Sequence, residues 1–422
     1  MRRPGGASRG SRLLVPPSAD LPGVILLQTF AECFILLILV NRRFRNGVNP
    51  RMHRGCRTMI DCRPFNGTRV RRLRKKTDQR VTLKDIAKAA NVNVSTVSRA
   101  LDPNPKHKVS SELAERIRKT SSRLGYRPNA AAYSLKTNRT RAIGVIIPDI
   151  TDPIFPPIIR GIEDGLNRHH YISIVANTDN DVEREADVLE SLSARGVDGL
   201  ILATTKRRDS IASQLAGDRP VVTIIRAMDH IPCSSVTHDE DEGFRRILGH
   251  LASLGHRDVA TIAGPQDVST GFMRYSSFVR YCKTFEINED GTQVAFARTF
   301  SEDEGERCTE ELLMKGRRFT ALVCANDQLA IGAIAALQRR GLICPRDVSV
   351  TGFNDMPLAG RLQPPLTTIR AQHHKLGLEA AQLILAALQD PETGQQSHHI
   401  VLPVELVVRD STAAARRVES AS

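Results

Sequence analysis

From residue 141 to about residue 410, short runs of apolar residues alternate with longer stretches in which apolar positions recur every three or four residues. A short continuous apolar run is typical of a strand buried on both faces, whereas the longer pattern is typical of a helix with one buried face. The runs predict strands at 142–148, 171–177, 197–203, 220–225, 258–263, 320–325 and 347–353. The stretches between them predict helices at 156–169, 183–195, 240–254, 272–286, 302–315 and 327–340.

This alternation predicts parallel sheets that are covered by helices on both faces. The region, about 270 residues, is too long for one sheet of this kind, so we expect two doubly wound lobes. Ligands of doubly wound sheets bind beyond the carboxyl ends of the strands. With two lobes, the predicted ligand site is therefore the cleft between them.

Ahead of this region, the pattern predicts two short helices joined by a three-residue turn. Thr82 and Asp85 have the spacing of a capping box, which predicts the start of the first helix. Asn91 suits the turn because asparagine tolerates the left-handed conformation. Asn93 is the expected N-cap of a second helix over 94–101. The residues expected to face inward are Leu83, Ile86, Ala87, Ala90, Val97 and Leu101.

A third helix follows, with Ser110 as its expected N-cap and Gly125 as its expected end. Its inward residues would be Leu113, Ile117 and Leu124. Such a unit is a helix-turn-helix, which lays its second helix in the major groove of DNA; the alternative is a small helical bundle without a DNA role. Two observations favour DNA. Residues 81–140 carry 12 Lys and Arg against 4 Asp and Glu, and the second helix exposes small hydroxyls with one arginine.

The strings LKDIAKAANVNVSTVSRAL, at 83–101, and LGYRPNAAAYSLK, at 124–136, closely resemble the N-terminus of the LacI/GalR family of bacterial transcription regulators. The resemblance continues to about residue 410. It implies a lambda repressor-like helix-turn-helix domain, a hinge helix, and an effector domain with the fold of type I periplasmic binding proteins. It also implies a homodimer that binds a palindromic double-stranded DNA operator and responds to a small-molecule effector such as a sugar or sugar derivative.

The resemblance assigns DNA contacts by position. The implied base-reading residues are Val94, Ser95 and Arg99, and the further DNA contacts are Thr82, Thr96 and Ser98. The Ala-rich segment 129–136 matches the hinge helix, which folds when two copies meet over the minor groove. Its Leu135 would wedge into a base step, a known way to bend DNA, with Ala132 and Lys136 facing the groove. The alternative is an ordinary linker helix, which would be marginal in water at this length.

The loops at the strand ends hold the expected effector contacts, which are Asp149, Phe155, Thr270, Arg274, Asn326, Asp327 and Asn354. The resemblance implies that Phe155 stacks on a ring of the ligand and that Arg274 and Asn326 hydrogen-bond to it. Asn354 stands where the family commonly has Asp, and Val268 stands where the purine-binding member has Arg, which argues against a purine. The alternative is that the polar residues cap loops and that Arg274 pairs with a carboxylate of its own lobe.

The whole chain has a formal net charge of +14, and the charge is concentrated at the front. Residues 1–80 carry 18 Lys and Arg against 4 Asp and Glu, with no apolar period after residue 40. We interpret them as an unstructured leader or as the product of a mis-assigned start. Residues 21–40 are a weak membrane-segment candidate, because Glu32 near the middle would cost about 2.5–3.5 kcal/mol on insertion. A signal peptide is a further alternative, although no cleavage site follows.

The remaining motifs favour no catalytic or metal chemistry. The eight cysteines are scattered and read as reduced thiols, and Cys56 and Cys62 lack the partners that a zinc site needs. No nucleophile elbow, phosphate-binding loop or zinc-protease motif occurs, so we expect neither enzyme activity nor a cofactor. We interpret the His pairs and the acidic runs as solvated surface; they lie at 169/170, 373/374, 398/399, 183–190 and 302–306.

Together these patterns predict the order of the domains along the chain. The order is a leader (1–80), a helix-turn-helix domain (81–128), a hinge helix and linker (129–140), a two-lobed domain (141–410) and a tail (411–422) that lacks a leucine heptad. The predicted function is a ligand-responsive repressor of a carbohydrate or nutrient-use operon, acting as a homodimer in the cytoplasm at the nucleoid. The alternatives are a solute sensor anchored by 21–40 and an enzyme on the same two-lobed fold.

Overall fold

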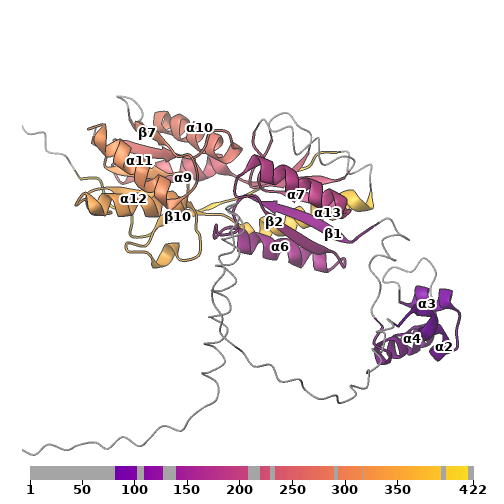
Figure 1. Ribbon diagram of the computed structural model, residues 1–422. Helices are drawn as coiled ribbons and strands as arrows, with labels where there is room; N and C mark the ends of the chain where they lie inside the picture. The colour runs from indigo at the N-terminus through magenta and orange to yellow at the C-terminus, as the bar shows by residue number, and fades with distance from the viewer. Residues whose placement is uncertain are drawn as a thin grey trace, which may run out of the picture. The chain divides into compact units, whose positions relative to one another are not determined.

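The computed structural model describes residues 81–101, 109–126, 139–207, 219–228, 233–288, 293–316, 318–390 and 396–416. They form a three-helix unit and an α/β body (Figure 1). The predicted leader, with its membrane-segment candidate and Cys56 and Cys62, lies outside these residues, as does the predicted hinge helix. Within the described ranges, no helix is both long enough and apolar enough to cross a membrane.

Three helices make up the N-terminal unit, α2 (Leu83–Ala90), α3 (Val94–Ala100) and α4 (Ser111–Arg123). The predicted capping box is confirmed, because the backbone N–H of Thr82 donates to the Asp85 carboxylate at 2.8 Å. Asn91 has the expected left-handed conformation, with φ 50°. Asn93 is the N-cap residue of α3, but its side chain accepts no hydrogen bond from the helix. The expected side-chain cap is therefore wrong, and the backbone carbonyl of Asn93 accepts the first helical bonds instead.

The core of this unit lies where the three helices meet. Ile86, Val97 and Ile117, one from each helix, are fully buried. Burial of an apolar side chain of this size contributes about 1.5–3 kcal/mol, so these three residues hold the helices together. The other predicted inward leucines lie at the edge of the core and are partly buried, namely Leu83, Leu101, Leu113 and Leu124.

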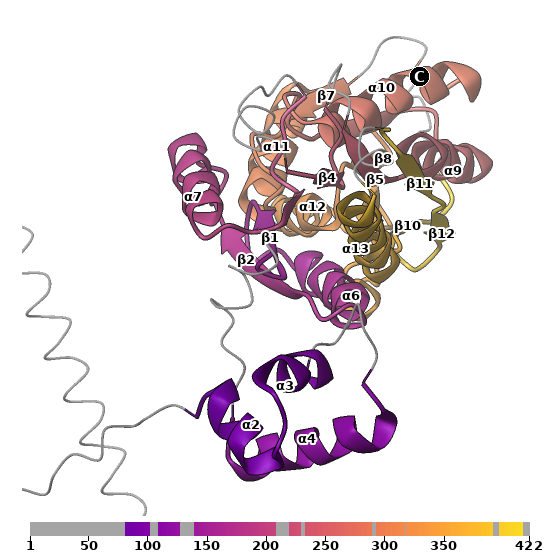
Figure 2. The same cartoon turned by 90° about the vertical axis from the view of Figure 1, so that its right-hand side faces the viewer.

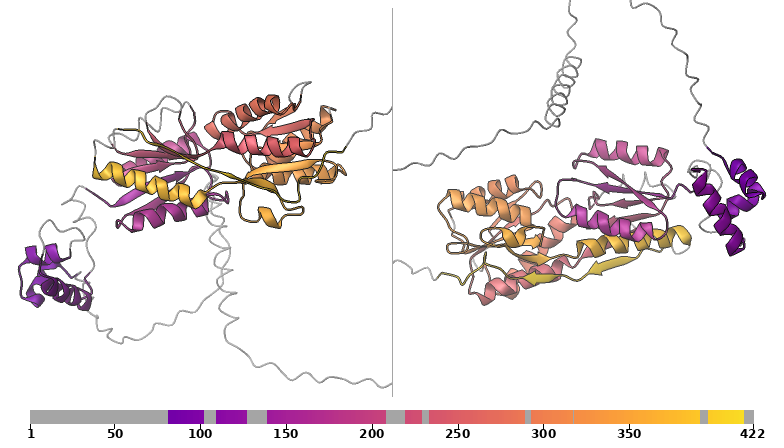
Figure 3. Two further views of the ribbon diagram at one scale, coloured as in Figure 1. Left: turned by 180° about the vertical axis from the view of Figure 1, so that it is seen from behind. Right: turned by 90° about the horizontal axis from the view of Figure 1, so that it is seen from below.

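The first lobe contains a parallel sheet with the strand order β11-β5-β4-β3-β1-β2. Its strands are β1 (Ala142–Ile147), β2 (Ile172–Asn177), β3 (Gly199–Leu202), β4 (Val221–Ile224), β5 (Ser234–His238) and β11 (His399–Leu402). Helices α6 (Phe155–Asn167) and α13 (His373–Gln389) cover one face, and α7 (Val182–Ala194) covers the other (Figure 3).

Helices α6 and α13 lie side by side (Figure 2). Their backbones approach so closely that a Cβ atom at Gly161 would lie 2.0 Å from the backbone oxygen of His374. Glycine is therefore required at this contact, because any side chain would push the two helices apart. The close contact ties α13, which follows a strand of the second lobe, firmly to the first lobe.

The second lobe contains a sheet with the strand order β12-β10-β9-β8-β6-β7, in which only β12 runs antiparallel to its neighbour. Its strands are β6 (Val259–Ala263), β7 (Gln293–Phe296), β8 (Ala321–Cys324), β9 (Ser349–Asn354), β10 (Thr367–Arg370) and β12 (Glu405–Val407). Helices α9 (Glu240–Ser253) and α10 (Ser269–Thr284) cover one face. Helices α11 (Glu302–Met314) and α12 (Asp327–Arg339) cover the other. The two doubly wound lobes predicted from the pattern are confirmed.

The chain crosses between the lobes three times, from β5 to α9, from β10 to α13 and from β11 to β12. Each lobe therefore combines segments that are far apart in the sequence. The first lobe is completed by α13 and β11, which come after the whole core of the second lobe. The sequence pattern did not predict this exchange, since periodicity describes single elements and not the lobe to which each belongs.

The pattern missed the strands β5, β7, β10, β11 and β12 and the helix α13. Each of these strands is three to five residues long, and β5, SSVTH, consists largely of polar residues. Such segments lack the continuous apolar run that identified the central strands, because they lie at or near the sheet edges. Helix α10 begins at Ser269, three residues earlier than predicted.

Candidate DNA-binding and ligand-binding sites

Helix α3 presents the residues expected to contact DNA. Val97 and Ala100 face the core, whereas Val94, Ser95 and Arg99 are exposed and Thr96 and Ser98 are partly exposed. The predicted division of this helix into an inner and an outer face is confirmed. The exposed Thr82 hydroxyl donates to the Asp85 carboxylate at 2.7 Å, so its clearest role is to cap α2. Three predicted DNA contacts lie outside the described residues, namely Ala132, Leu135 and Lys136.

A cleft of about 610 Å³ lies between the two lobes. It is lined from both lobes by residues that follow the carboxyl ends of the strands and by the first turns of several helices. From the first lobe these include Asp149, Asp152, Thr178, Asn180, Glu185, Thr204, Lys206 and Arg226. From the second lobe they include Pro265, Asp267, Val268, Arg298, Phe300, Ser301 and Gln328. The position at the strand ends is the one that the doubly wound pattern predicts for a ligand.

Of the seven predicted effector contacts, the structure places Asp149 in the lining of this cleft. The Asp149 carboxylate accepts hydrogen bonds from the backbone N–H of Thr151 at 2.8 Å and from the Thr151 hydroxyl at 2.7 Å. One of its oxygen atoms is therefore engaged in a loop turn. Neither of these bonds uses the other carboxylate oxygen.

Phe155 and Thr270 are placed away from the cleft lining. Phe155 is the first residue of α6, is 2% exposed, and packs in the core of the first lobe. Thr270 is buried in the first turn of α10. In this arrangement the ring of Phe155 has no face toward the cleft on which a ligand could stack.

Arg274 is 4% exposed and makes its contacts within the second lobe. Its guanidinium forms an ion pair with Glu240 at 2.5 Å, donates to the backbone oxygen of Ala325 at 2.6 Å, and lies 3.8 Å from the ring centroid of Phe353. The structure thus shows the alternative that the sequence left open, pairing with a carboxylate of its own lobe. These contacts engage three of its five N–H donors and one face, and Arg274 is not among the residues that line the cleft.

Asn326 and Asp327 also make hydrogen bonds within the second lobe. The Asn326 side chain caps α12 by accepting from the backbone N–H of Leu329 at 2.9 Å. The buried Asp327 carboxylate accepts from the backbone N–H of Met356 at 2.8 Å and from the Thr368 hydroxyl. Burial raises the pKa of Asp327 to about 7 despite these bonds. This carboxyl group therefore links the segments that follow β8 and β9 to β10. Its burial carries a desolvation cost.

Asn354, the last residue of β9, is buried and has φ 118°. Its backbone oxygen accepts a hydrogen bond from Nε2 of His373, which begins α13. His373 is itself buried, so the prediction that the 373/374 pair lies on the surface is wrong for this residue. Its ring meets the buried ring of His238 edge to face, with the centroids 5.5 Å apart.

The two histidines lie on two of the three lobe crossovers. Burial lowers the pKa of His238 to about 3 and that of His373 to about 4, and the nearby Arg274 cation adds to both shifts. Among the described residues, Nε2 of His238 and Nδ1 of His373 have no hydrogen-bond partner. Both imidazoles are therefore neutral in this arrangement, since a second proton would be buried without an acceptor.

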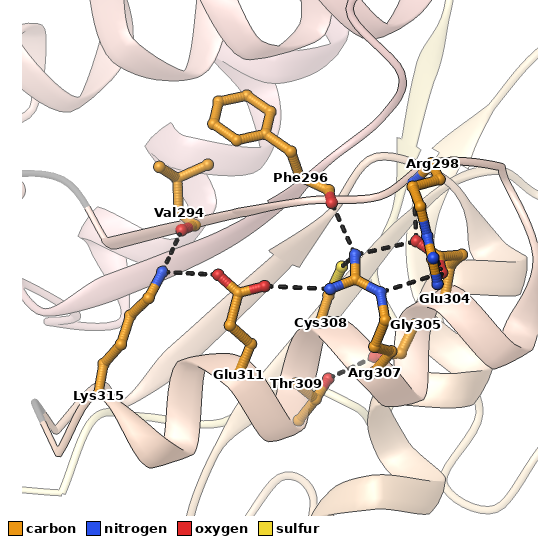
Figure 4. A network of polar contacts seen from close by, with 10 residues as sticks. All are labelled: Val294, Phe296, Arg298, Glu304, Gly305, Arg307, Cys308, Thr309, Glu311 and Lys315. Atoms are coloured by element: carbon orange, nitrogen blue, oxygen red, sulfur yellow. Dashed lines mark hydrogen bonds and ion pairs between the residues drawn. The ribbon is translucent and has the colours of Figure 1, made fainter.

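Three basic side chains line the cleft within the described residues, and two of them are paired. The Lys206 ammonium lies 2.9 Å from the Asp267 carboxylate. Arg298 is held by Glu304, which accepts from its Nη2 at 2.5 Å and from its backbone N–H at 2.7 Å (Figure 4). The third is Arg226, whose guanidinium donates to the backbone oxygen of Thr204 at 3.3 Å.

Glu304 corrects the expectation that the acidic run at 302–306 is wholly solvated. Glu304 is 6% exposed, and the Arg307 and Arg298 guanidinium groups lower its pKa to about 2 (Figure 4). The carboxylate is therefore charged at neutral pH and fixes Arg298 at the rim of the cleft. Its polar partners explain how a charged group is buried at the start of α11.

Sequence reasoning did not identify Asp152, Arg226 and Arg298 as cleft residues. Arg226 follows the predicted strand 220–225 almost at once, so the rule that selected the other strand-end loops would have found it. Asp152 lies in the same loop as Asp149 and lacked only a motif to single it out. Arg298 follows β7, which the pattern missed, so no strand end was available to point to it.

A set of direct contacts joins the lobes beside the cleft, and we call it the clasp. The backbone N–H of Arg207 donates to the backbone oxygen of Asp267 at 2.9 Å, and the Arg207 guanidinium lies 3.6 Å from the ring centroid of Phe272. The backbone N–H of Ala227 donates to the Ser269 hydroxyl at 2.9 Å. The ion pair between Lys206 and Asp267 belongs to the same set. The loops after β3 and β4 of the first lobe thus contact the start of α10 in the second lobe.

In the described part of the chain, no cluster of side chains suits metal binding or thiol chemistry. Within those residues, no group of three or more His, Cys, Asp and Glu side chains could hold a metal ion. The described cysteines are free thiols, and burial raises the pKa of Cys282 and Cys344 to about 12. These two thiols are therefore protonated and unreactive at neutral pH.

Comparison with known proteins gives two domain matches and many relatives. Residues 82–129 match the profile of bacterial regulatory proteins of the lacI family, and residues 248–412 match a periplasmic binding protein-like domain. The chain is 33% identical over 338 residues to the HTH-type transcriptional regulator RegA of Clostridium saccharobutylicum, covering 78% of this chain and 99% of that protein. It is 31% identical to the HTH-type transcriptional repressor CytR of Escherichia coli strain K12, with 81% and 98% covered.

Solved structures agree with these relatives. The lac repressor dimer bound to operator and the anti-inducer ONPF matches with a TM-score of 0.69 and 29% identity, covering 79% of this chain and 99% of that one. The complex of the transcriptional regulator CelR with cellobiose matches with a TM-score of 0.60 and 27% identity, covering 79% and 100%. These matches extend over both the three-helix unit and the two lobes.

Proposed function

This chain belongs to the LacI family of bacterial regulatory proteins, and from that premise we propose that it represses a carbohydrate or nutrient-use operon under the control of a small ligand. It is a sequence-specific DNA-binding transcriptional regulator. The observation that carries the proposal is the pairing of two sites in one chain. A helix with an outward face of hydroxyls and one arginine precedes a two-lobed body with a polar cleft of about 610 Å³.

The proposed mechanism couples the cleft to the operator through the arrangement of the lobes. A ligand that contacts both walls of the cleft favours one lobe arrangement over another, because it binds the two arrangements with different affinity. In a homodimer, that change alters the spacing of the two α3 helices, which must read two half-sites. Operator affinity then changes by the coupling free energy, typically about 1–3 kcal/mol.

Several partners follow from this proposal. They are a palindromic double-stranded operator, a second copy of the chain, and a sugar or sugar derivative. The relatives named above are regulators, which supports the proposal that the chain is not an enzyme. A regulator that contacts the operator directly must reach the chromosome, so we place it in the cytoplasm at the nucleoid. In the first lobe we propose Asp149, Asp152 and Arg226 as ligand contacts, with Arg298 in the second.

Selection of random duplex DNA by the purified full-length chain tests the proposed function. We expect an enriched palindrome at a fixed, moderate salt concentration, because two α3 helices would each read one half-site. An enriched site without symmetry would contradict the dimeric mechanism. Absence of any enriched site, both with and without a cell metabolite extract, would contradict the regulator proposal itself.

A further inference from the structure

Arg226 differs from the other two basic residues that line the cleft. Lys206 has a carboxylate oxygen 2.9 Å away, and Arg298 has one 2.5 Å away. Within the described part of the chain, Arg226 has no carboxylate within ion-pair distance, and its one hydrogen bond is the 3.3 Å contact with the Thr204 carbonyl. A guanidinium has five N–H donors, so most of those on Arg226 are left for a partner in the cleft.

The surroundings of Arg226, which is partly exposed, remove part of the water around its guanidinium. Burial lowers its pKa to about 10, even though Asp267, Asp152 and Glu185 act in the opposite direction from a distance. A partly desolvated cation is stabilised by a paired anion in direct contact. Among the described side chains, none makes that contact with this guanidinium.

The backbone in front of Arg226 is also strained. Ile225 has φ 65°, a conformation that is rare for a β-branched residue, and the N–H of Arg226 donates to the carbonyl of Ile224 at 2.6 Å in a tight turn. This turn carries the chain out of β4 and directs the Arg226 side chain to the cleft wall. Strain of this kind persists where the resulting geometry is needed.

Asp152 lies in the same wall of the cleft and needs hydrogen-bond donors, whereas Arg226 needs acceptors. Burial raises the pKa of Asp152 to about 6, and its carboxylate accepts a hydrogen bond from the backbone N–H of Ile154 at 3.1 Å. Asp149 lies beside it and lines the cleft as well. In the part of the chain that the structure describes, no ion pair links Asp152 to Arg226, so the wall offers hydrogen-bond acceptors and a separate, unmatched guanidinium.

We propose that the ligand is a hydroxy acid, such as a sugar acid, whose carboxylate binds Arg226 and whose hydroxyl groups donate to Asp149 and Asp152. This inference rests on the proposed function, since it names the ligand class of the same cleft. A carboxylate matches the planar fork of a guanidinium in a bidentate pair. A hydroxyl supplies the proton that each aspartate oxygen accepts.

The charge of the lining selects a carboxylate over a phosphate. Six carboxylates of the described residues line the cleft, namely Asp149, Asp152, Glu185, Asp267, Glu302 and Asp303. Against them stand the three basic residues, of which only Arg226 lacks an anionic partner among the described side chains. A dianionic phosphate would need more positive charge than one free guanidinium supplies, whereas a single carboxylate is matched by it.

Heat unfolding of the full-length chain with defined ligands tests this inference. The probes are D-gluconate and D-galacturonate as hydroxy acids, D-glucose and D-galactose as their neutral parents, and D-glucose 6-phosphate, all at one millimolar concentration. We expect at least one hydroxy acid, but neither neutral sugar nor the phosphate, to raise the Tm. In Arg226→Gln, the Kd of that acid measured by calorimetry should increase about 10- to 100-fold, the usual effect of losing a charged hydrogen-bond partner.

Two controls make the outcome specific. Arg195→Gln changes an exposed arginine of the same lobe that donates to Ser191, so it should leave the Kd unchanged. Arg226→Lys keeps the charge but not the fork, and should recover only part of the affinity. The inference is overturned if no hydroxy acid raises the Tm, if a neutral sugar or the phosphate does so instead, or if Arg226→Gln binds the acid as tightly as the parent chain.

The operator measurement separates this inference from the proposed function. Arg195→Gln should bind the selected operator with the same affinity as the parent chain when no ligand is added. If the chain binds a hydroxy acid through Arg226 but selects no DNA, the regulator proposal fails and the ligand assignment stands. If it selects an operator but ignores every hydroxy acid, the ligand assignment fails alone.

Discussion

Arg226 is partly exposed and Arg274 is buried, and their surroundings give the two arginines different roles. Arg274 has a carboxylate at 2.5 Å, a carbonyl at 2.6 Å and an aromatic ring beneath it. Arg226 has one carbonyl at 3.3 Å. A satisfied guanidinium stabilises the fold, whereas an unsatisfied one is available to a ligand. At the scale of the residue, the partners therefore decide the role and the residue type does not.

Arg99 provides the first residue-scale prediction. Replacement of Arg99 by Ala should weaken binding to the selected operator by about 1–3 kcal/mol and relax the preference at one base position, because the side chain is exposed on the outward face of α3. Lys119→Ala, which removes an exposed partner of Glu115 on α4, is the matched control and should keep the preference. Competition binding with each base at every position measures both. An unchanged base preference in the Arg99 variant would remove it from the reading set.

The buried residues His238 and His373 provide the second residue-scale prediction. Their folded pKa values, about 3 and about 4, lie below the ordinary value of 6.5. Below pH 6.5 the unfolded chain therefore binds protons that the folded chain does not, and stability is lost as the pH falls from about 6.5 toward 4. Each histidine should contribute a slope of up to about 1.4 kcal/mol per pH unit in this window.

Denaturant unfolding at several pH values from roughly 4.5 to 7.5 checks this slope, because that range covers most of the pH window in which the two histidines affect stability. His238→Gln should lower the dependence on pH by about one proton relative to the parent chain. His169→Gln, at an exposed position on the first lobe, should leave it unchanged. The comparison between variants is needed because Asp327 has the opposite effect. Its pKa is raised to about 7, so its contribution to the stability of the fold decreases as the pH rises. Equal slopes in all three chains would contradict the neutral histidine pair.

At the scale of the element, the second lobe is joined through its helix starts. Glu240 begins α9, Arg274 lies on α10, and Ala325 precedes α12, so one ion pair with one hydrogen bond links three helices. Asp327 does the same for strands, since it binds the segment after β9 and the hydroxyl of Thr368 on β10. These buried polar groups explain why the predicted effector residues of this lobe are poorly exposed. They connect elements below the cleft.

Arg274→Ala should therefore destabilise the fold. The change leaves the Glu240 carboxylate buried without its partner, which typically costs about 3–5 kcal/mol. The sequence alone suggested a different role for Arg274, a hydrogen bond to the effector, so that its loss would abolish the effector response and leave DNA binding intact. Denaturant unfolding of Arg274→Ala measures the free energy directly, and the double variant Arg274→Met with Glu240→Gln should be less destabilised than Arg274→Ala because no buried charge remains. A stable Arg274→Ala that no longer responds to ligand would restore the original expectation.

At the scale of the whole molecule, two kinds of connection join the lobes. Three crossovers connect them covalently, and the clasp adds contacts from Lys206, Arg207 and Ala227 to the segment Asp267–Phe272. Such contacts must change if the lobes rotate, so the clasp biases the lobe arrangement. Their individual strengths are modest, because exposed ion pairs and cation–π contacts contribute only about 0–1 kcal/mol each.

The double variant Lys206→Ala with Phe272→Ala tests the clasp. Loss of about 1–2 kcal/mol would shift the balance between lobe arrangements by a factor of about 5–30. We expect a broader distance distribution, extending to longer distances, between spin labels at Glu190 on α7 and Met314 on α11, both exposed. Lys315→Ala removes an ion pair within the second lobe and should not change the distribution. Identical distributions for all three proteins would show that the crossovers alone set the lobe arrangement.

The sequence by itself determined the three N-terminal helices, the central strands of both sheets and the residues that face outward on α3. A capping box, a helical period and a continuous apolar run each depend on neighbours within a few residues, so Thr82 with Asp85, and the buried strand β1, could be predicted from the string alone. The rule for strand ends also located the cleft, because the carboxyl ends of parallel strands meet at one edge.

Only the tertiary structure decided which polar side chains remain without partners. Arg274 and Glu240 are 34 positions apart, and the three crossovers exchange α13 and β11 between the lobes. Whether an arginine meets a carboxylate or faces a cleft depends on such distant pairings, which leave no local periodicity. That is the physical reason why the sequence could not show that Arg274 is paired with a carboxylate and Arg226 is not.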